Sequence, residues 1–197
     1  KAMIPGLVAA WRALPASDAR RAALADQVAM LEGWDTRWSA ESQATTLAVF
    51  WGEALWAELG EAAQAARMNV PMYLVTHSTP EQKLAGLATA VERLQRDFGS
   101  WRVAWGEVNR WQRLDASIRP RFDDAQPSIP VPFASAQWGS LAAYGSRAWP
   151  GTKRYYGTLG NSFVAVVEFG PRVKAMAVHP GGQSGDPAST HFRDQAA

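Results

Sequence analysis

GTLGNSFVAVVEFG (residues 157–170), VKAMAV (173–178) and GGQSGDPASTHFRDQ (181–195) are the consecutive segments that decide the fold. Aromatic and β-branched residues alternate with glycine in this part of the chain, which is typical of β-strands. Residues 163–169 and 173–178 are apolar at successive positions, as strands covered on both faces are. We therefore expect two strands joined by a tight turn, then a glycine-rich loop and the start of a helix.

Upstream, the chain carries the start and stop signals of helices. Thr79-Pro-Glu-Gln82 combines a capping threonine, a proline at the first helical position and a glutamine three residues after the cap. Leucines at helical spacing follow as far as Gly99, so these residues predict a long helix. Further helices are expected from Pro5 to Ala13, from a cap at Ser17 or Asp18 to Leu31, and from about Ser42 onward.

Four prolines separate this helical half from the strands. They stand at positions 120, 127, 130 and 132 and favour extended, poorly paired backbone. We interpret residues 1–114 as a helical region and residues 115–197 as a long connection followed by sheet strands and a glycine-rich loop. The two regions are expected to form one α+β unit.

Composition excludes several classes of protein. The chain has 197 residues, 47% of them hydrophobic and 19% charged, so one substantial core can form. Its 20 basic and 18 acidic residues are interspersed, which gives no basic stripe for nucleic acid. No apolar run is long enough to span a membrane. The absence of cysteine excludes disulfides and thiol chemistry.

Three segments resemble landmarks of one family, in that family's order. They are LEGWD (31–35), FGSWRVAWGEVNRWQRL (98–114) and the strand pair with its glycine-rich loop. Together they resemble the C-terminal part of the β chain of penicillin acylase family proteins. These proteins are amidohydrolases with an N-terminal nucleophile, and the resemblance covers nearly the whole chain.

The resemblance implies a four-layered αββα sandwich decorated by helices. It also implies a precursor that cuts itself and exposes a serine, whose α-amino group takes the hydroxyl proton. An asparagine side chain and a backbone N–H would stabilise the oxyanion. Implied substrates are N-acylated compounds such as β-lactam side-chain amides and N-acyl homoserine lactones, with no cofactor. The implied location is periplasmic or secreted.

The residues that perform this chemistry in the family are not found in the sequence. Lys1 is not a serine, cysteine or threonine, and Asn109 and Asn161 lie in motifs other than that of the oxyanion asparagine. Nor does the chain continue past Ala197, where the family's β chain does. We therefore expect an incomplete fold that is inactive alone. Its partners would be the remainder of the same acylase, the α chain and the N-terminal part of the β chain.

The glycine-rich loop is the best candidate for a binding role, because loops at strand ends gather functional residues on a rigid sheet. We predict binding roles for Gln183, Ser184 and Asp186. A nucleophile elbow would need glycine at position 186. Ser184 is therefore not expected to be a nucleophile, and the alternative is a structural turn in which serine and aspartate bind free amides.

Asp186, His191 and Asp194 can supply metal ligands, but their spacing matches no standard pattern. The alternative is a helix capped by Ser189 or Thr190, and we predict no metal. His77 and the histidine at position 179 are isolated in sequence, so neither is expected to be a general base.

Glu107, Asn109 and Arg110 lie between Trp105 and Trp111. Polar groups between large rings can line an acyl pocket. The favoured alternative is a short amphipathic helix that buries its apolar side.

Ten tryptophans leave two other functions open. One is a non-catalytic binding module, which needs several indole rings in a row at the surface. The other is a structural subunit packed against a catalytic partner, which predicts apolar surface left uncovered.

Overall fold

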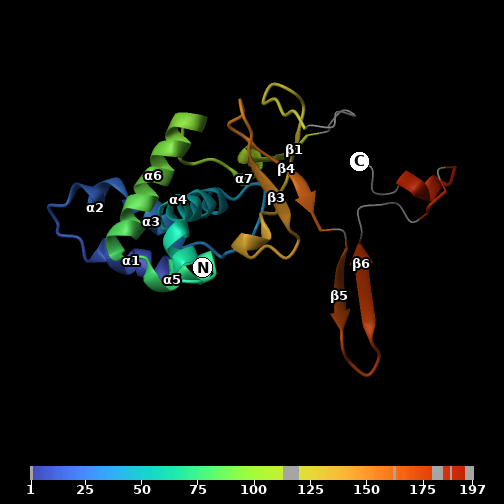
Figure 1. Ribbon diagram of the computed structural model, residues 1–197, viewed down its shortest axis with the longest axis horizontal. Helices are drawn as coiled ribbons and strands as arrows, with labels where there is room; N and C mark the ends of the chain where they lie inside the picture. The colour runs from blue at the N-terminus through green and yellow to red at the C-terminus, as the bar shows by residue number, and fades with distance from the viewer. Residues whose placement is uncertain (1, 113–119, 162, 179–183, 187, 194–197) are drawn as a thin grey trace.

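The computed structural model describes residues 2–112, 120–161, 163–178, 184–186 and 188–193 (Figure 1). The helices are α1 (Ile4–Arg12), α2 (Ala19–Ala23), α3 (Ala25–Glu32), α4 (Gln43–Ala65), α5 (Val70–His77), α6 (Pro80–Phe98) and α7 (Trp105–Val108). The strands are β1 (Asn109–Trp111), β2 (Ile129–Pro130), β3 (Tyr144–Ala148), β4 (Tyr155–Gly160), β5 (Val164–Glu168) and β6 (Lys174–Val178). Two 3₁₀ turns, η1 (Ala136–Trp138) and η2 (Thr190–Arg193), complete the elements.

The expected helix signals are confirmed at α1, α4 and α6. Ser42 caps α4 by accepting a hydrogen bond from the amide of Thr45. Thr79 and Gln82 form the capping box at the start of α6, and Gly99 ends that helix at φ 78°. Glycine suits this left-handed position because it has no Cβ to clash with the backbone.

Two helices differ from expectation. The single helix predicted up to Leu31 is two helices, because the backbone at Leu24 leaves the helical region (φ −106°, ψ 4°). Asp18 provides the first cap. Helix α5 was not predicted, since its valine, tyrosine and threonine have low helix propensity. Asn69 caps it, and a proline in its first turn supports it.

The hydrophobic core lies between α1, α3, α4, α5 and α6. These helices gather at one end of the molecule (Figure 1). Leucines at helical spacing supply most of the fully buried side chains: Leu7, Leu31, Leu47, Leu55, Leu74, Leu84, Leu87 and Leu94. The helical half therefore buries a continuous core.

A four-stranded sheet, with strand order β2-β1-β4-β3, packs beside the helices. Strand β1 pairs parallel with β4, and the other two pairings are antiparallel. Tyr155 of β4 joins the sheet to the helical core, because its ring stacks on Phe50 of α4 at 5.4 Å. Since β1 lies within residues 1–114, the sheet draws strands from both regions of the chain.

Gly106 marks a close approach between α7 and the segments that flank it. A Cβ at this position would lie 2.8 Å from Cβ of Pro130 and 3.1 Å from the carbonyl oxygen of Ala40. We expect Gly106→Ala to lower the free energy of unfolding by about 1–3 kcal/mol, because backbone has to move. Urea unfolding checks this value. Gly170→Ala is the control, since a Cβ there meets nothing closer than 3.9 Å, and an equal loss in both variants would contradict the prediction.

Strands β5 and β6 form the expected antiparallel pair, with Val164 opposite Val178 and Glu168 opposite Lys174. This hairpin projects from the rest of the described chain (Figure 1). Its apolar pattern predicts burial, yet Val166 is 64% exposed, Phe169 85% and Met176 78%. The described residues provide nothing to cover either face, so the apolar surface expected of an incomplete fold is present.

The α+β class, with a helical first half and small sheets in the second half, is confirmed. The described strands make a four-stranded and a two-stranded sheet, not the layers of a complete αββα sandwich. An isolated two-stranded hairpin is at best marginally stable in water. An incomplete fold accounts for this arrangement.

Candidate functional site

The glycine-rich loop is described in part. Ser184 accepts a hydrogen bond from the amide of Asp186 at 3.1 Å, and Asp186 accepts one from the amide of Ala188 at 2.9 Å. Ser189 accepts one from the amide of His191, at the start of η2. These are the local bonds of the structural alternative. Gln183 lies outside the described residues, and binding by Ser184 and Asp186 stays a prediction.

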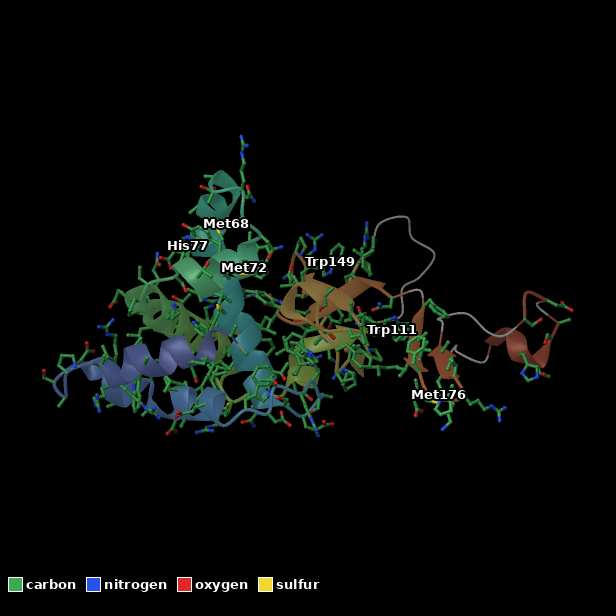
Figure 2. The ribbon with its side chains drawn as sticks, turned by 90° about the horizontal axis from the view of Figure 1, so that it is seen from below. Met68, Met72, His77, Trp111, Trp149 and Met176 are labelled. Atoms are coloured by element: carbon green, nitrogen blue, oxygen red, sulfur yellow. The ribbon has the colours of Figure 1, made fainter. Side chains whose placement is uncertain are left out.

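The contacts of His77 are those of a helix end, not of a general base that activates a nucleophile. His77 ends α5 (Figure 2). Its ring stacks on that of Tyr73, with the ring centres 4.4 Å apart. Its Nδ1 lies 2.7 Å from the hydroxyl of Thr76, but that hydroxyl donates to the carbonyl of Met72. Within the described ranges no three histidine, aspartate or glutamate side chains gather as metal ligands. The histidine at position 179 and Asp194 lie outside the described residues.

Asn109, a candidate for the acyl pocket, is fully buried, and each polar atom of its side chain is hydrogen-bonded. Its Nδ2 donates to the carbonyls of Val131 at 2.8 Å and Phe133 at 2.7 Å. Its Oδ1 accepts from the hydroxyl of Ser146 at 2.5 Å. The side chain therefore joins β1, β3 and the connection after β2, and both of its polar atoms have partners within the protein.

Of the residues around Asn109, some make structural contacts and others are exposed to solvent. Trp105 is buried and donates its indole N–H to the carbonyl of Phe133. Arg110 bonds the hydroxyl and the carbonyl of Ser128, and Glu107 is exposed. The expected short helix ends at Val108, and Trp111, the last residue of the inner strand β1, is 38% exposed instead of buried (Figure 2). These contacts support the structural alternative for the segment.

A half-buried charged cluster, not predicted from the sequence, lies between α4, α6 and β4. Nη1 of Arg93 donates to Oε2 of Glu53 at 2.9 Å, and Nη2 donates to the hydroxyl of Tyr155 at 2.7 Å. Tyr155 in turn donates to the same carboxylate oxygen. The guanidinium lies 4.5 Å from the ring centre of Phe50. We call Glu53, Arg93 and Tyr155 the carboxylate cluster.

Burial changes the acidity of the carboxylate cluster. It raises the pKa of the Glu53 carboxyl, because lost hydration outweighs the hydrogen bond from Tyr155 and the charge of Arg93. It also raises the pKa of the Tyr155 hydroxyl well above its ordinary 10.0, and the neighbouring charge of Glu53 adds to this shift. Its hydrogen bonds connect α4 and α6 to β4, which is a structural role.

The raised pKa of Tyr155 predicts alkaline unfolding. Above pH 10 the unfolded chain releases the tyrosine proton while the folded chain retains it, so stability is lost as pH rises through the folded pKa. Burial raises the pKa of Tyr144 and Tyr156 in the same direction. We expect the free energy of unfolding to fall from pH 10 to 11.5, and Tyr155→Phe to make the fall shallower. Urea titrations across this range check it, and identical slopes in both proteins would contradict it.

The tryptophans do not form an exposed row. Trp51 and Trp105 are each 1% exposed, and Trp111 is the one exposed ring of the ten. The remaining seven are half-buried: Trp11, Trp34, Trp38, Trp56, Trp101, Trp138 and Trp149. The surface that a tryptophan-rich binding module requires is therefore not observed.

Within the described parts, no helix combines the length and apolar character needed to cross a membrane.

Comparison with known protein families identifies the family of this chain. A family model described as penicillin amidase matches residues 2–197, nearly the whole chain. A search of curated protein sequences returned no match. The matched range includes the helical core, both sheets and the glycine-rich loop.

Proposed function

The chain belongs to the penicillin amidase family, and we propose that it is part of an amidohydrolase that cleaves the amide bond of N-acylated substrates. Candidate substrates are β-lactam side-chain amides and N-acyl homoserine lactones. We place the intact protein in the periplasm or outside the cell on the same family resemblance.

The proposed reaction uses a serine outside residues 1–197. Its hydroxyl oxygen attacks the amide carbonyl carbon, its proton passes by way of the α-amino group to the leaving amine, and an acyl ester forms. Water then hydrolyses this ester and releases the carboxylic acid. Two observations support a nucleophile elsewhere: Ser184 is held in a local turn, and the hydroxyl of Thr76 donates to a backbone carbonyl.

Amine release and covalent labelling test this function. The intact protein should release amine from N-acylated substrates, and a sulfonyl fluoride, which reacts with activated serines, should abolish that release. Mass spectrometry of the labelled peptides should then place the label outside residues 1–197. A label on Ser184, or amine release that survives stoichiometric labelling, would contradict the proposal.

The exposed hairpin supports a role for the chain as one part of a larger fold. Strands β5 and β6 pair with one another, and within the described chain no third strand joins their outer edges. Apolar side chains also stand exposed on them. We propose that the remainder of the same acylase adds strands to these edges and covers these faces.

Hydrogen–deuterium exchange tests the covered hairpin. Amides of Val164–Glu168 and Lys174–Val178 should exchange at least about 100-fold more slowly in the intact protein than in the isolated chain, because burial and added pairing oppose opening. Helix α6 is the internal control, since its contacts lie within the chain. Fast exchange of the hairpin in both samples, with α6 protected in both, would contradict the proposed contact.

A further inference from the structure

A pocket with tryptophan walls lies between the helices and the segment at η1, and none of its described lining residues belongs to the strand pair or the glycine-rich loop. Its volume is about 230 Å³, and it opens between the start of α1, the loop before α4, helix α4 itself and the residues at η1. Four indoles line it: Trp34, Trp38, Trp51 and Trp138. We call it the indole pocket.

The walls of the indole pocket are held in place by packing. Trp34 and Trp38 meet edge to face with their ring centres 6.1 Å apart. Trp138 packs against the backbone of α4 at Gly52, where an added Cβ would lie 2.7 Å from the indole ring. Trp51 is buried and donates its indole N–H to the carbonyl of Lys83. The rings therefore line a pocket whose shape exists before any ligand binds.

The backbone at the pocket is strained. Thr36 lines the pocket and has φ 65°, a left-handed conformation that a β-branched residue rarely adopts. Such strain persists where the surrounding structure imposes it, and it clusters at ligand-binding sites. The strained residue thus lies between Trp34 and Trp38, two of the indoles that line the pocket.

The lining selects against charge. Among the described residues that line the pocket, Thr36 carries the one polar side chain apart from the indole N–H groups, and none is charged. Asp35 and Arg37, which flank Thr36, are exposed and lie 3.9 Å apart as an ion pair. A charged ligand would lose its hydration here without gaining a partner.

The volume indicates the size of the ligand. An apolar protein cavity of about 150 Å³ accepts benzene. A pocket of about 230 Å³ has room for a second ring or a short substituent. Indole walls favour flat partners through edge-to-face and offset contacts.

We propose that the indole pocket is a binding site for a neutral bicyclic aromatic molecule, or for a neutral aromatic ring with a short substituent. The site goes beyond the proposed amide hydrolysis and does not depend on it. Its ligand is recognised by apolar contact with the tryptophan walls.

Equilibrium dialysis of the intact protein with indole tests this site. We expect saturable binding with a dissociation constant below about 1 mM, a moderate affinity suited to a small ligand. Indole-3-acetate and tryptamine, which keep the ring and add a negative or a positive charge, should bind at least about tenfold more weakly. Binding of all three with equal affinity, or the absence of saturable binding, would overturn the proposal.

Two matched substitutions on α4 locate the binding. Ala48→Leu fills the pocket and should weaken indole binding at least about tenfold, since a misplaced methylene in an apolar pocket has effects of this size. Ala57→Leu makes the same change at an exposed position of the same helix and should leave the affinity unchanged. Equal affinity in Ala48→Leu, or equal weakening in both variants, would overturn the assignment.

A ¹⁹F NMR measurement needs no substitution in the pocket, so it tests the site even if Ala48→Leu fails to fold. With 5-fluorotryptophan in the intact protein, added indole should shift the ¹⁹F signals of Trp34, Trp38 and Trp138. The signals of Trp101 and Trp149, which do not line the pocket, should stay in place. Shifts confined to these two rings would overturn the proposal even if indole binds.

Discussion

Replacing Arg93 by methionine is expected to lower the free energy of unfolding by about 3 kcal/mol at pH 7.5. The change leaves the carboxylate of Glu53 half-buried without its cation, and breaking such a pair typically costs about 3–5 kcal/mol. The low end of this range applies because 27% of the Glu53 side chain and 32% of the Arg93 side chain are exposed to solvent. Urea unfolding followed by tryptophan fluorescence measures the loss.

The pH dependence of this loss identifies its cause. Burial already raises the pKa of Glu53, and removal of the arginine charge raises it further. Protonation then relieves the unpaired charge, so the defect of Arg93→Met should shrink as the pH falls from 7.5 to 5. The double variant Glu53→Gln with Arg93→Met should recover part of the loss at pH 7.5. A defect independent of pH in the single variant would show that lost packing on Phe50, not lost charge, is responsible.

Replacing Asn109 by alanine is expected to lower the free energy of unfolding by about 3 kcal/mol. The amide makes three hydrogen bonds, to the carbonyls of Val131 and Phe133 and from the hydroxyl of Ser146. Each contributes about 1 kcal/mol, and the buried carbonyls lose partners that water does not replace. The free energy of unfolding, obtained from urea titration, checks the value.

Asn161→Ala is the matched control for Asn109→Ala. Asn161 is exposed and accepts one hydrogen bond, from the amide of Ala143. Its loss should cost about 0.5 kcal/mol or less, as at most surface positions. If Asn109→Ala left stability unchanged but lowered amide turnover in the intact protein, the structural role of Asn109 would be wrong and the acyl-pocket interpretation would return.

Local signals in the sequence predicted much of the fold. The capping box at Thr79, the cap at Ser42 and the paired strands after Gly160 depend on neighbours a few residues away, so a reader of the sequence can find them. Helix α5 was missed because its cap at Asn69 is followed by residues of low helix propensity.

The carboxylate cluster could not be predicted in this way. Glu53 and Tyr155 are 102 positions apart, and their contact depends on how the sheet packs against the helices. Helical spacing places Glu53 and Arg93 on their helices but does not say which residues face one another. The buried Trp51 gives no signal for Glu53, because residues two apart on a helix do not share a face.

The apolar pattern of strands β5 and β6 predicts burial that the described residues do not provide. Their pattern predicts burial on both faces, yet Phe169 and Met176 are largely exposed. A residue's side chain is selected by its environment in the intact protein, so the pattern of β5 and β6 indicates a covering layer. Family membership and the exposed hairpin thus lead to the same expectation.

The N-terminal sequence and intact mass of the native chain that contains residues 1–197 test the central claim most directly. We predict a polypeptide that begins with serine upstream of Lys1, in a preparation that releases amine from N-acylated substrates. A preparation with the same activity whose chain begins at Lys1, and whose sulfonyl fluoride label falls within residues 1–197, would contradict it.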